Sequence, residues 1–298
     1  MSLQKASPCK INLLLNILGK RTDCFHELET VMQPVNVFDE LSFSRSAGGI
    51  QLSCGDPNLP TDSRNLVFRA AEKFLAAGKI SDGVSIHLEK NIPLAAGLGG
   101  GSGDAATTLL GLNELFGAPL SLESLEEIAA SIGSDVPFFL QTPDRDVKLR
   151  PALGTGRGER IELLDFFPAL RGAALLLIHP GFGVPTSWAY QALARFPAAL
   201  NGKRERANEL IALLKLGDLK TAGAAFYNAL EAPVLEKYPL LALFQDFLRA
   251  NGATATLMSG SGSTTFALVQ QGEATAAELR NKFRRKFGET CWMAVVSV

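Results

Sequence analysis

The sequence predicts a two-layer α/β protein in two lobes. Stretches with apolar residues at every second position recur along the 298 residues, together with stretches that carry apolar residues at helical spacing. The two kinds do not alternate regularly, which argues against a doubly wound parallel sheet. A chain of this length can bury two cores. We therefore expect an N-terminal lobe over residues 1–165 and a C-terminal lobe over residues 166–298.

The first elements are a strand, a turn and a second strand. In "KINLLLNI", residues 10–17, the alternation of apolar residues indicates a half-buried strand. Lys10 and Asn12 then share one face of that strand. The segment "GKRTDCFHE" is rich in Gly, Asp and charge and predicts a turn, and "LETVMQPVNV" after it predicts another strand.

Helices are expected on both sides of a glycine-rich stretch. "RNLVFRAAEKFLAA" has apolar residues at helical spacing and ends at Gly78, and Asn65 is better explained as its cap than as a ligand. "GVSIHLEKNIPL" alternates and predicts a strand that leads into the glycines. Beyond them, "DAATTLLGLNELFG" predicts a helix that ends at Gly117, and "SLESLEEIAASIG" predicts a helix between Ser121 and Gly133.

The second of these helices is followed by a tight segment, "SDVPFFL", in which Asp135 lies between the stop of a helix and Pro137. Residues 141–159 are polar and contain glycines, which indicates a loop or a hairpin. "GAALLLIHPG" predicts a buried strand, and the chain from there to residue 250 is expected to be mostly helical. "LMSGSGSTTFALV" and "CWMAVVSV" predict later strands.

Composition excludes several classes of function. The formal net charge of −1 gives no overall field that would attract nucleic acid or an anionic membrane. The four cysteines form no C-x-x-C pair, which argues for a reducing, cytoplasmic compartment and against a structural zinc site. No apolar run approaches the roughly 20 residues that span a bilayer. We expect a soluble protein.

The glycine-rich stretch "PLAAGLGGGSGDAATTLL", residues 93–110, fits either a flexible linker or an anion-binding loop. A linker is flanked by polar, aperiodic sequence, whereas this stretch lies between a strand and a helix. Free N–H groups and the positive end of a helix dipole at such a point bind phosphate, and Ser102 or Asp104 could help to hold a magnesium ion. Neither the G-x-x-x-x-G-K-[ST] spacing nor G-x-G-x-x-G fits.

The same stretch, "PLAAGLGGGSGDAAT", resembles the phosphate-binding signature of the GHMP kinases, the superfamily of galactokinase, homoserine kinase and mevalonate kinase. Three further segments are similar to one branch of that superfamily: "CKINLLLNILGKRTDCFHELETV", "IGSDVPFFL" and "LMSGSGSTTFAL". "GRGERIELL" and "HPGFGVPTSWAY" lie between them in the expected order. This branch phosphorylates the 2-hydroxyl of a cytidine-diphosphate-linked methylerythritol in non-mevalonate isoprenoid synthesis.

The resemblance implies the GHMP kinase fold, with the active site in a cleft between two lobes, and it implies ATP and Mg²⁺. Asp135 would be the catalytic acid–base residue with Lys10 as its partner. Asn12 would hold the substrate, and Phe25, His26 and Tyr190 would bind the pyrimidine. Adenine would lie near Asn65 and Lys90, with Thr186 close to the phosphates. The triphosphate would lie on Pro93, Leu94, Ala95, Ala96, Gly97, Leu98, Gly99, Gly100, Gly101, Ser102 and Gly103. No nucleic acid or membrane partner is implied, and a monomer or weak homodimer is expected.

The chain departs from the family pattern at Gly103, where a second serine is usual, and at Phe25, where Tyr is more common. The stretch between "DVPFFL" and "GRGE" is also longer than expected. Two other functions compete with this assignment. One is another small-molecule kinase of the superfamily, such as a homoserine or mevalonate type. The other is a non-catalytic ATP-binding protein, which would be marked by the loss of Lys10 or Asp135, and both are present.

Overall fold

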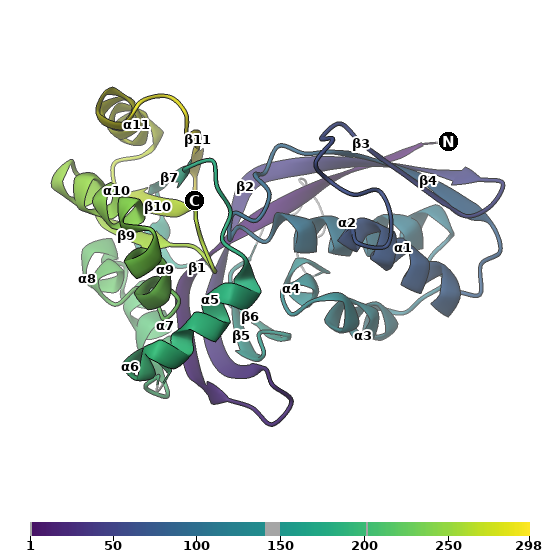
Figure 1. The fold of residues 1–298 in the computed structure, drawn as a ribbon, viewed down its shortest axis with the longest axis horizontal. Helices are drawn as coiled ribbons and strands as arrows, with labels where there is room; N and C mark the ends of the chain where they lie inside the picture. The colour runs from purple at the N-terminus through teal and green to yellow at the C-terminus, as the bar shows by residue number, and fades with distance from the viewer. Residues whose placement is uncertain (1, 141–149, 201) are drawn as a thin grey trace.

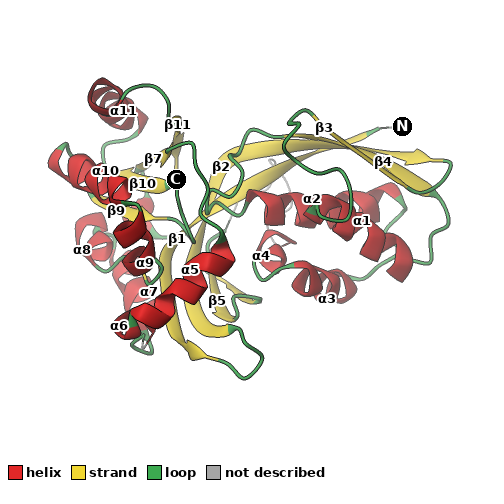
Figure 2. Cartoon of the chain, viewed as in Figure 1, coloured by secondary structure: helices red, strands yellow, loops and turns green. Residues whose placement is uncertain are grey.

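The computed structural model describes residues 2–140, 150–200 and 202–298 and contains two sheets covered by helices, so the predicted mixed α/β architecture is confirmed (Figures 1 and 2). In this part of the chain the larger sheet has seven strands, in the order β3-β4-β2-β1-β8, with β5 paired to β2 and β6 paired to β5. The smaller sheet has the order β11-β7-β10-β9. Pairs in both sheets are mainly antiparallel, which confirms that this is not a doubly wound fold.

The strands β1 (Leu3–Lys20) and β2 (His26–Ser46) form a long antiparallel pair that runs through both lobes, joined by the predicted turn at residues 21–25 (Figure 1). The prediction that β1 is half-buried is wrong, because residues 6–17 are all buried. The helix α2 (Gly100–Leu115) packs on this strand, and so does α7 (Arg206–Leu216) from the C-terminal part. Alternation in the sequence cannot reveal a second covering layer from so far along the chain.

The helices of the N-terminal lobe lie together on one face of the larger sheet (Figure 1). The predicted caps are confirmed for α1, where Asn65 accepts a hydrogen bond from Val67 N, and for α3, where Ser121 accepts one from Ser124 N. The expected start of α2 after the glycines is wrong, since the helix begins at Gly100. Besides α2, the elements are β3 (Ile50–Cys54), α1 (Leu66–Ala77), β4 (Gly83–Glu89), α3 (Leu122–Ile132) and α4 (Val136–Leu140).

The hairpin expected within residues 141–159 is confirmed for its described part, while residues 141–149 lie outside the described residues. Its strands are β5 (Ala152–Gly156) and β6 (Arg160–Leu163), and β5 pairs with β2. The hairpin thereby lies beside the turn between β1 and β2. This places "GRGE", residues 156–159, close to "CFHE", residues 24–27.

The C-terminal part combines the smaller sheet with helices, as the sequence predicts. Its strand β8 returns to the larger sheet and pairs in parallel with β1 at Leu14 and Leu15. The two lobes therefore share a sheet, and the division of the chain near residue 165 stays a prediction. The strands are β7 (Ala174–His179), β8 (Tyr227–Asn228), β9 (Ala255–Met258), β10 (Thr265–Val269) and β11 (Trp292–Ser297). Besides α7, the helices are α5 (Thr186–Ala192), α6 (Pro197–Leu200), α8 (Leu219–Ala224), α9 (Glu231–Lys237), α10 (Pro239–Ala250) and α11 (Glu273–Phe287).

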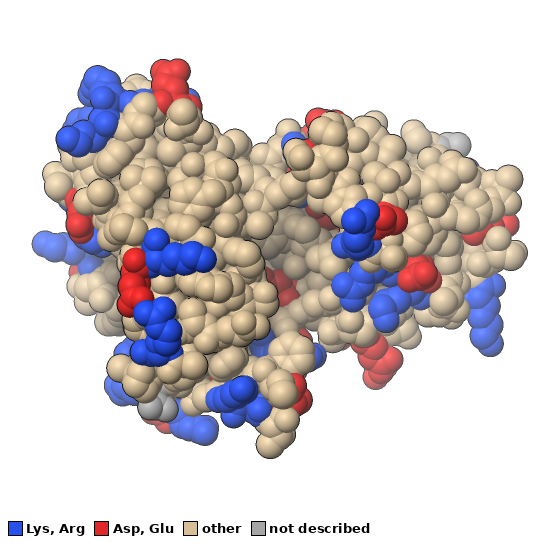
Figure 3. Space-filling view, viewed as in Figure 1, with Lys and Arg blue, Asp and Glu red and all other residues tan. Residues whose placement is uncertain are grey.

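The surface carries charged side chains of both signs, interspersed, and is hollowed between the two lobes (Figure 3). Within the described ranges, none of the helices has the length and apolar character needed to cross a bilayer. The buried side chains under the larger sheet include Phe43, Phe74 and Phe138, and those of the C-terminal lobe include Phe244 and Phe283. A third cluster contains buried residues from both parts of the chain, so the two lobes are also packed together through a shared core.

Candidate active site

A cavity of about 920 Å³ receives side chains from both lobes. Most of the residues singled out in the sequence line it, whereas Asn65, Gly103 and Asp104 do not. Those that do are Lys10, Asn12, Phe25, His26, Lys90, the stretch from Pro93 to Ser102, Asp135, Thr186 and Tyr190. Segments that are far apart in the sequence therefore meet at one site, as expected of a cleft between lobes.

Lys10 and Asp135 are brought together inside this cavity. Lys10 Nζ is 3.4 Å from Asp135 Oδ2, and the lysine side chain is 3% exposed while the aspartate side chain is 37% exposed. Lys10 Nζ also donates a hydrogen bond of 2.6 Å to Asn12 Oδ1. A buried ammonium requires such partners, since an unpaired charge would be costly at this depth. The carboxylate is thus held at the cavity wall by a cation that water barely reaches.

The orientation of Asn12 is set by a second pair of hydrogen bonds. Asn12 Nδ2 donates to Thr30 Oγ1 at 2.8 Å, and the Thr30 hydroxyl donates to the carbonyl of Leu14 at 2.6 Å. These bonds direct the amide oxygen of Asn12 toward Lys10. Strand β1 thereby presents a lysine and an asparagine to the cavity in a fixed arrangement, which agrees with the prediction that the two share a face.

The glycine-rich loop is clamped between β1 and a turn of the C-terminal lobe. The backbone N of Lys10 donates to Leu98 O at 2.9 Å, and Ser259 Oγ donates to Gly97 O at 2.9 Å. Gly97 has a φ of +78°, and a Cβ there would lie 2.1 Å from Ser259 O. Glycine is therefore required at this position both by the dihedral angle and by the close approach of backbone. The loop is a built structure, and the flexible-linker interpretation is wrong.

The departure from the family pattern at Gly103 has a steric cause in this chain. A Cβ at Gly103 would lie 2.4 Å from Pro8 O and 3.0 Å from Ser7 Oγ, because α2 packs closely on β1 there. A serine would need one of the two elements to move. Ser102, which lines the cavity, is therefore the serine that the first turn of α2 offers to a ligand.

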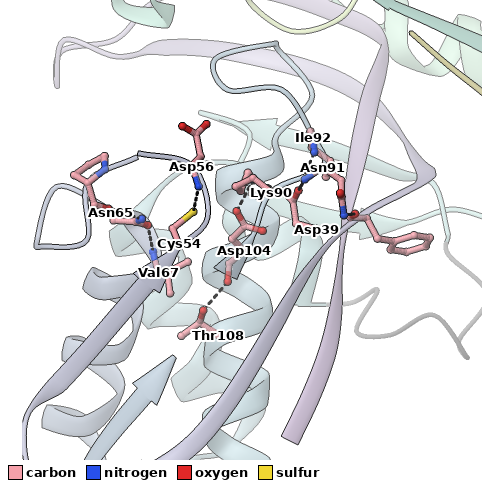
Figure 4. A network of polar contacts seen from close by, with 12 residues as sticks. Asp39, Cys54, Asp56, Asn65, Val67, Lys90, Asn91, Ile92, Asp104 and Thr108 are labelled. Atoms are coloured by element: carbon pink, nitrogen blue, oxygen red, sulfur yellow. Dashed lines mark hydrogen bonds and ion pairs between the residues drawn. The ribbon is translucent and has the colours of Figure 1, made fainter. Parts of the chain in front are cut away.

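Lys90, in the segment between β4 and the glycine-rich loop, lies between the buried carboxylates of Asp39 and Asp104 (Figure 4). Its Nζ donates to Asp104 Oδ2 at 2.7 Å and also to Asp39 Oδ2. Desolvation raises the pKa of Asp104 to about 7, and the charge of Lys90 opposes that rise. Burial by itself lowers the pKa of Lys90, but Asp104 and Asp39 outweigh it, so that the net pKa is raised. The lysine stays a cation and its two partners hold it in place.

Asp39 also fixes the segment that leads into the glycine loop. Its Oδ1 accepts hydrogen bonds from the backbone N of Asn91 at 2.7 Å and of Ile92 at 2.8 Å (Figure 4). Asp39 is fully buried, so these charge-assisted bonds are shielded from water. No pattern in the sequence indicates this role of Asp39, because the residue is far from the loop along the chain.

Asn65 is a helix cap, as its sequence context favoured. Its Oδ1 accepts a hydrogen bond from Val67 N at 2.9 Å, and its Nδ2 donates to Pro60 O at 2.8 Å. Both ends of the amide are therefore used locally, and a contact with adenine stays a prediction. Thr186 does line the cavity, and its Oγ1 lies 2.9 Å from Ser261 Oγ.

The residues expected to bind the pyrimidine line the cavity, and their side chains make two ring contacts. The rings of His26 and Tyr190 have centroids 5.1 Å apart. Phe25, which is 50% exposed, carries the guanidinium of Arg157 above its ring at 4.8 Å. Burial, followed by the charge of Lys20, lowers the pKa of His26, so its ring is neutral at pH 7 and can both donate and accept.

Several cavity residues were not assigned a role from the sequence. Arg157 lies in "GRGE", and Gly260 and Ser261 lie in "SGSG". Both segments contributed to the resemblance, so their spacing was a signal, but nothing local indicates which side chain faces the cavity. Among the described residues, no group of three or more His, Cys, Asp or Glu side chains is arranged to hold a metal ion.

Comparison with known proteins places this arrangement in a family. The model of the GHMP kinases N terminal domain matches residues 65–142, and the model of the GHMP kinases C terminal domain matches residues 210–289. A 4-diphosphocytidyl-2-C-methyl-D-erythritol kinase of Pelotomaculum thermopropionicum is 42% identical over 96% of this chain and 95% of its own. One of Geobacter metallireducens is 38% identical over 99% and 97%.

Solved structures show the same relationship. A crystal structure of 4-(cytidine 5'-diphospho)-2C-methyl-D-erythritol kinase has a TM-score of 0.77 and 31% identity, and the match covers 99% of this chain and 100% of the other. The homoserine kinase from Cytophaga hutchinsonii has a TM-score of 0.69 at 20% identity, which shows a shared fold. The resemblance drawn from the glycine-rich stretch is thus confirmed, and the chain belongs to the GHMP kinases and, within them, to the family of 4-diphosphocytidyl-2-C-methyl-D-erythritol kinases.

Proposed function

We propose that this protein transfers the γ-phosphoryl group of ATP to the 2-hydroxyl of 4-diphosphocytidyl-2-C-methyl-D-erythritol, a step of non-mevalonate isoprenoid synthesis. The observation that carries the proposal is the contact of 3.4 Å between Lys10 and Asp135, in one cavity with the glycine-rich loop and with Phe25, His26 and Tyr190. Relatives that are 42% and 38% identical carry the name of this kinase. The loop suits a triphosphate, and the aromatic end suits a base.

Asp135 would accept the proton of the attacking hydroxyl, and Lys10 would place that carboxylate and offset charge on the transferred group. The transition state of phosphoryl transfer is loose, so positioning and charge neutralisation are the main requirements. Lys10 and Asn12 are held rigidly, which suits positioning. The backbone N–H groups at the start of α2 would receive the phosphates of ATP, with Lys90 and Thr186 at the two sides.

The oxygen atoms available in the cavity fit a magnesium ion that binds together with ATP. Mg²⁺ is commonly bound by few protein oxygens together with substrate phosphates and water. The Ser102 hydroxyl lines the cavity and would serve as one ligand. When bound, the ion would neutralise charge on the β- and γ-phosphates. A role for Asp104 at the metal stays a prediction that requires its ion pair with Lys90 to open.

A coupled assay of ADP release tests the proposal. The cytidine-diphosphate-linked substrate is compared with its uridine counterpart, with galactose and with homoserine, each at several concentrations with ATP and Mg²⁺. We expect the highest kcat/KM for the cytidine compound by at least about two orders of magnitude, because a site that hydrogen-bonds one base edge leaves polar groups unpaired with another. Equal turnover of homoserine or galactose would contradict the proposal. Absence of ADP release with every acceptor would favour a non-catalytic ATP-binding protein.

A further inference from the structure

The cations that line the cavity differ in how closely they are paired with carboxylates. Four lysine and arginine side chains of the described residues take part: Lys10, Lys20, Lys90 and Arg157. Lys10 is bound by Asn12 and Asp135, and Lys90 by Asp39 and Asp104. The guanidinium of Arg157 makes a loose ion pair with Glu159, in which Nε and Oε1 are 3.8 Å apart, too far for a hydrogen bond. The charge of Asp23 also acts on this guanidinium. No hydrogen bond from the guanidinium is found among the described residues, so its N–H donors remain available to an anion.

The turn that carries Arg157 has a defined backbone. Gly156 and Gly158 have φ values of +72° and +106°, which favour glycine. Gly158 N donates to Thr155 O at 3.0 Å, and the Arg157 backbone N donates to the Glu159 carboxylate at 2.6 Å. The hairpin between β5 and β6 thus ends in a closed turn that directs Arg157 into the cavity. Its side chain is 28% exposed, so a ligand can reach it.

The position of this turn is intermediate between the two ends of the expected substrate. On one side, Arg157 Cζ lies 4.8 Å from the centroid of the Phe25 ring. On the other side, the Cβ position of Gly158 is 3.9 Å from Ser134 Cβ, and Ser134 directly precedes Asp135. A nucleotide-linked alcohol that contacts Phe25 with its base and Asp135 with its hydroxyl carries its diphosphate between these points. The turn that carries Arg157 therefore lies beside the place where two negative charges would be.

We infer that Arg157 binds the diphosphate of the cytidine-linked substrate and makes the enzyme select nucleoside diphosphate conjugates over the free alcohol; this rests on the proposed function. The planar guanidinium presents five donors and can bind phosphate oxygens at two points. Stacking on Phe25 keeps the plane oriented before the substrate arrives, which reduces the entropy lost on binding. Lys20 is the second cavity cation that is not paired with Asp135, Asp39 or Asp104. It lies at the end of β1, near His26.

The inference is tested with Arg157→Gln, Arg157→Lys, Lys20→Gln and the control Arg160→Gln, which removes an exposed arginine three residues away that does not line the cavity. Binding of CDP and of cytidine is measured by calorimetry, without turnover. We expect Arg157→Gln to weaken the binding of CDP by about ten- to a hundredfold, the loss typical of a charge-assisted contact. The affinity for cytidine should change by less than about threefold. Arg157→Lys should restore part of the loss, and Arg160→Gln should leave both affinities unchanged.

Steady-state kinetics provide the second measurement. Arg157→Gln should raise KM for the cytidine-diphosphate-linked substrate with little change in kcat or in KM for ATP, because the contact is remote from the reacting atoms. Equal weakening of CDP and cytidine would overturn the inference, as it would assign Arg157 to the base. A CDP-selective loss in Lys20→Gln but not in Arg157→Gln would also overturn it. Failure of the wild type to phosphorylate the substrate would contradict the proposed function, whereas the comparison of CDP with cytidine would still decide on Arg157.

Discussion

Lys10 shows how a single charged residue is tolerated in the middle of a buried strand. Its side chain is 3% exposed, and its ammonium contacts Asn12 Oδ1, Asp135 Oδ2 and, at 3.4 Å, the carbonyl of Gly97. Each partner belongs to a different element: strand β1 itself, the segment before α4 and the glycine-rich loop. Burying a lysine is unfavourable for the fold unless such partners are present. The three partners therefore make the burial of Lys10 tolerable, and its role at the site is the prediction tested next.

Asp135→Asn is expected to reduce kcat by about a hundredfold or more, because an amide cannot accept the hydroxyl proton. The side chain is 37% exposed, so the fold should remain intact. Lys10→Ala should cause a loss of similar size. The measurement is the ADP-release assay together with a thermal melting curve. The matched control is Asp165→Asn, a change at a side chain that is 90% exposed. A near-normal rate for Asp135→Asn in folded protein would contradict the assignment.

Phe25 and His26 are expected to contribute differently to recognition of the base. Stacking on a base is worth roughly 1 to 3 kcal/mol, so Phe25→Ala should raise KM for the cytidine substrate about ten- to a hundredfold with little effect on ATP. His26→Ala should reduce the preference for the cytidine over the uridine substrate more than Phe25→Ala does. Stacking on Phe25 tolerates any base, whereas a hydrogen bond from His26 distinguishes one base from another. Phe166→Ala serves as control, because this exposed phenylalanine does not line the cavity. Weaker ATP binding in Phe25→Ala would mean that the two ends of the site are reversed.

At the scale of elements, the glycine-rich loop depends on its neighbours from both lobes. Ala96 O accepts a hydrogen bond from Thr264 N at 3.1 Å, and Gly97 O accepts one from Ser259 Oγ at 2.9 Å. The Asp39 carboxylate holds the residues just before the loop. The loop therefore has its shape before a nucleotide arrives, which lowers the entropy that binding must overcome.

Gly97→Ala tests this packing against Gly101→Ala. At Gly97 the φ is +78° and a Cβ would lie 2.1 Å from Ser259 O, so we expect the free energy of unfolding to fall by about 1 to 3 kcal/mol, with weaker ATP binding. At Gly101, which is helical, the nearest atom to a Cβ is Leu66 Cδ1 at 3.7 Å, and stability should not fall. Urea unfolding and nucleotide calorimetry provide the measurements. Equal stability of the two variants would show that the loop adapts freely.

At the scale of the whole molecule, the two lobes are joined by shared strands and by the loop contacts, and the cavity lies between them. Strands β1 and β2 run through both lobes, and β8 returns from the C-terminal part to pair with β1 (Figure 1). The cluster of Asp39, Lys90 and Asp104, of which Lys90 lines the cavity, ties β2, the segment after β4 and α2 together. The stability of the molecule should therefore respond to the ionisation of this cluster.

Asp104→Asn tests that response as a function of pH. The pKa of Asp104 is raised from 3.8 to about 7 in the folded state, so the folded protein keeps a proton that the unfolded chain releases. The stabilisation that this proton contributes is present below pH 4 and is lost as the pH rises through 7. The free energy of unfolding of the wild type minus that of the variant should thus decrease between pH 5 and pH 8. A decrease of at least about 1.4 kcal/mol, the equivalent of one pKa unit, is expected from urea unfolding. A difference that grows with pH would contradict the pKa shift.

The local elements were largely predictable from the sequence because their signals are local. Asn65 and Ser121 predict the starts of α1 and α3, and Gly78 predicts the end of α1. The structure has the helix caps at these residues. The error at the start of α2 has a physical reason: glycines are poor helix formers, but Gly100 and Gly103 are held by packing against Ile92 and Pro8. Tertiary contact there outweighs intrinsic preference.

The sequence by itself determined the family, and it predicted the glycine-rich loop, Lys10 and Asp135 as parts of one site, since these depend on short motifs in a fixed order. Only the tertiary structure decided that Asp104 pairs with Lys90 beside Asp39, that Gly103 cannot be a serine beside Pro8, and that Arg157 covers Phe25. Each of these contacts joins segments from different parts of the fold. Their distances follow from how sheets and helices pack, and the periodicity of a single segment carries no information about its distant neighbours.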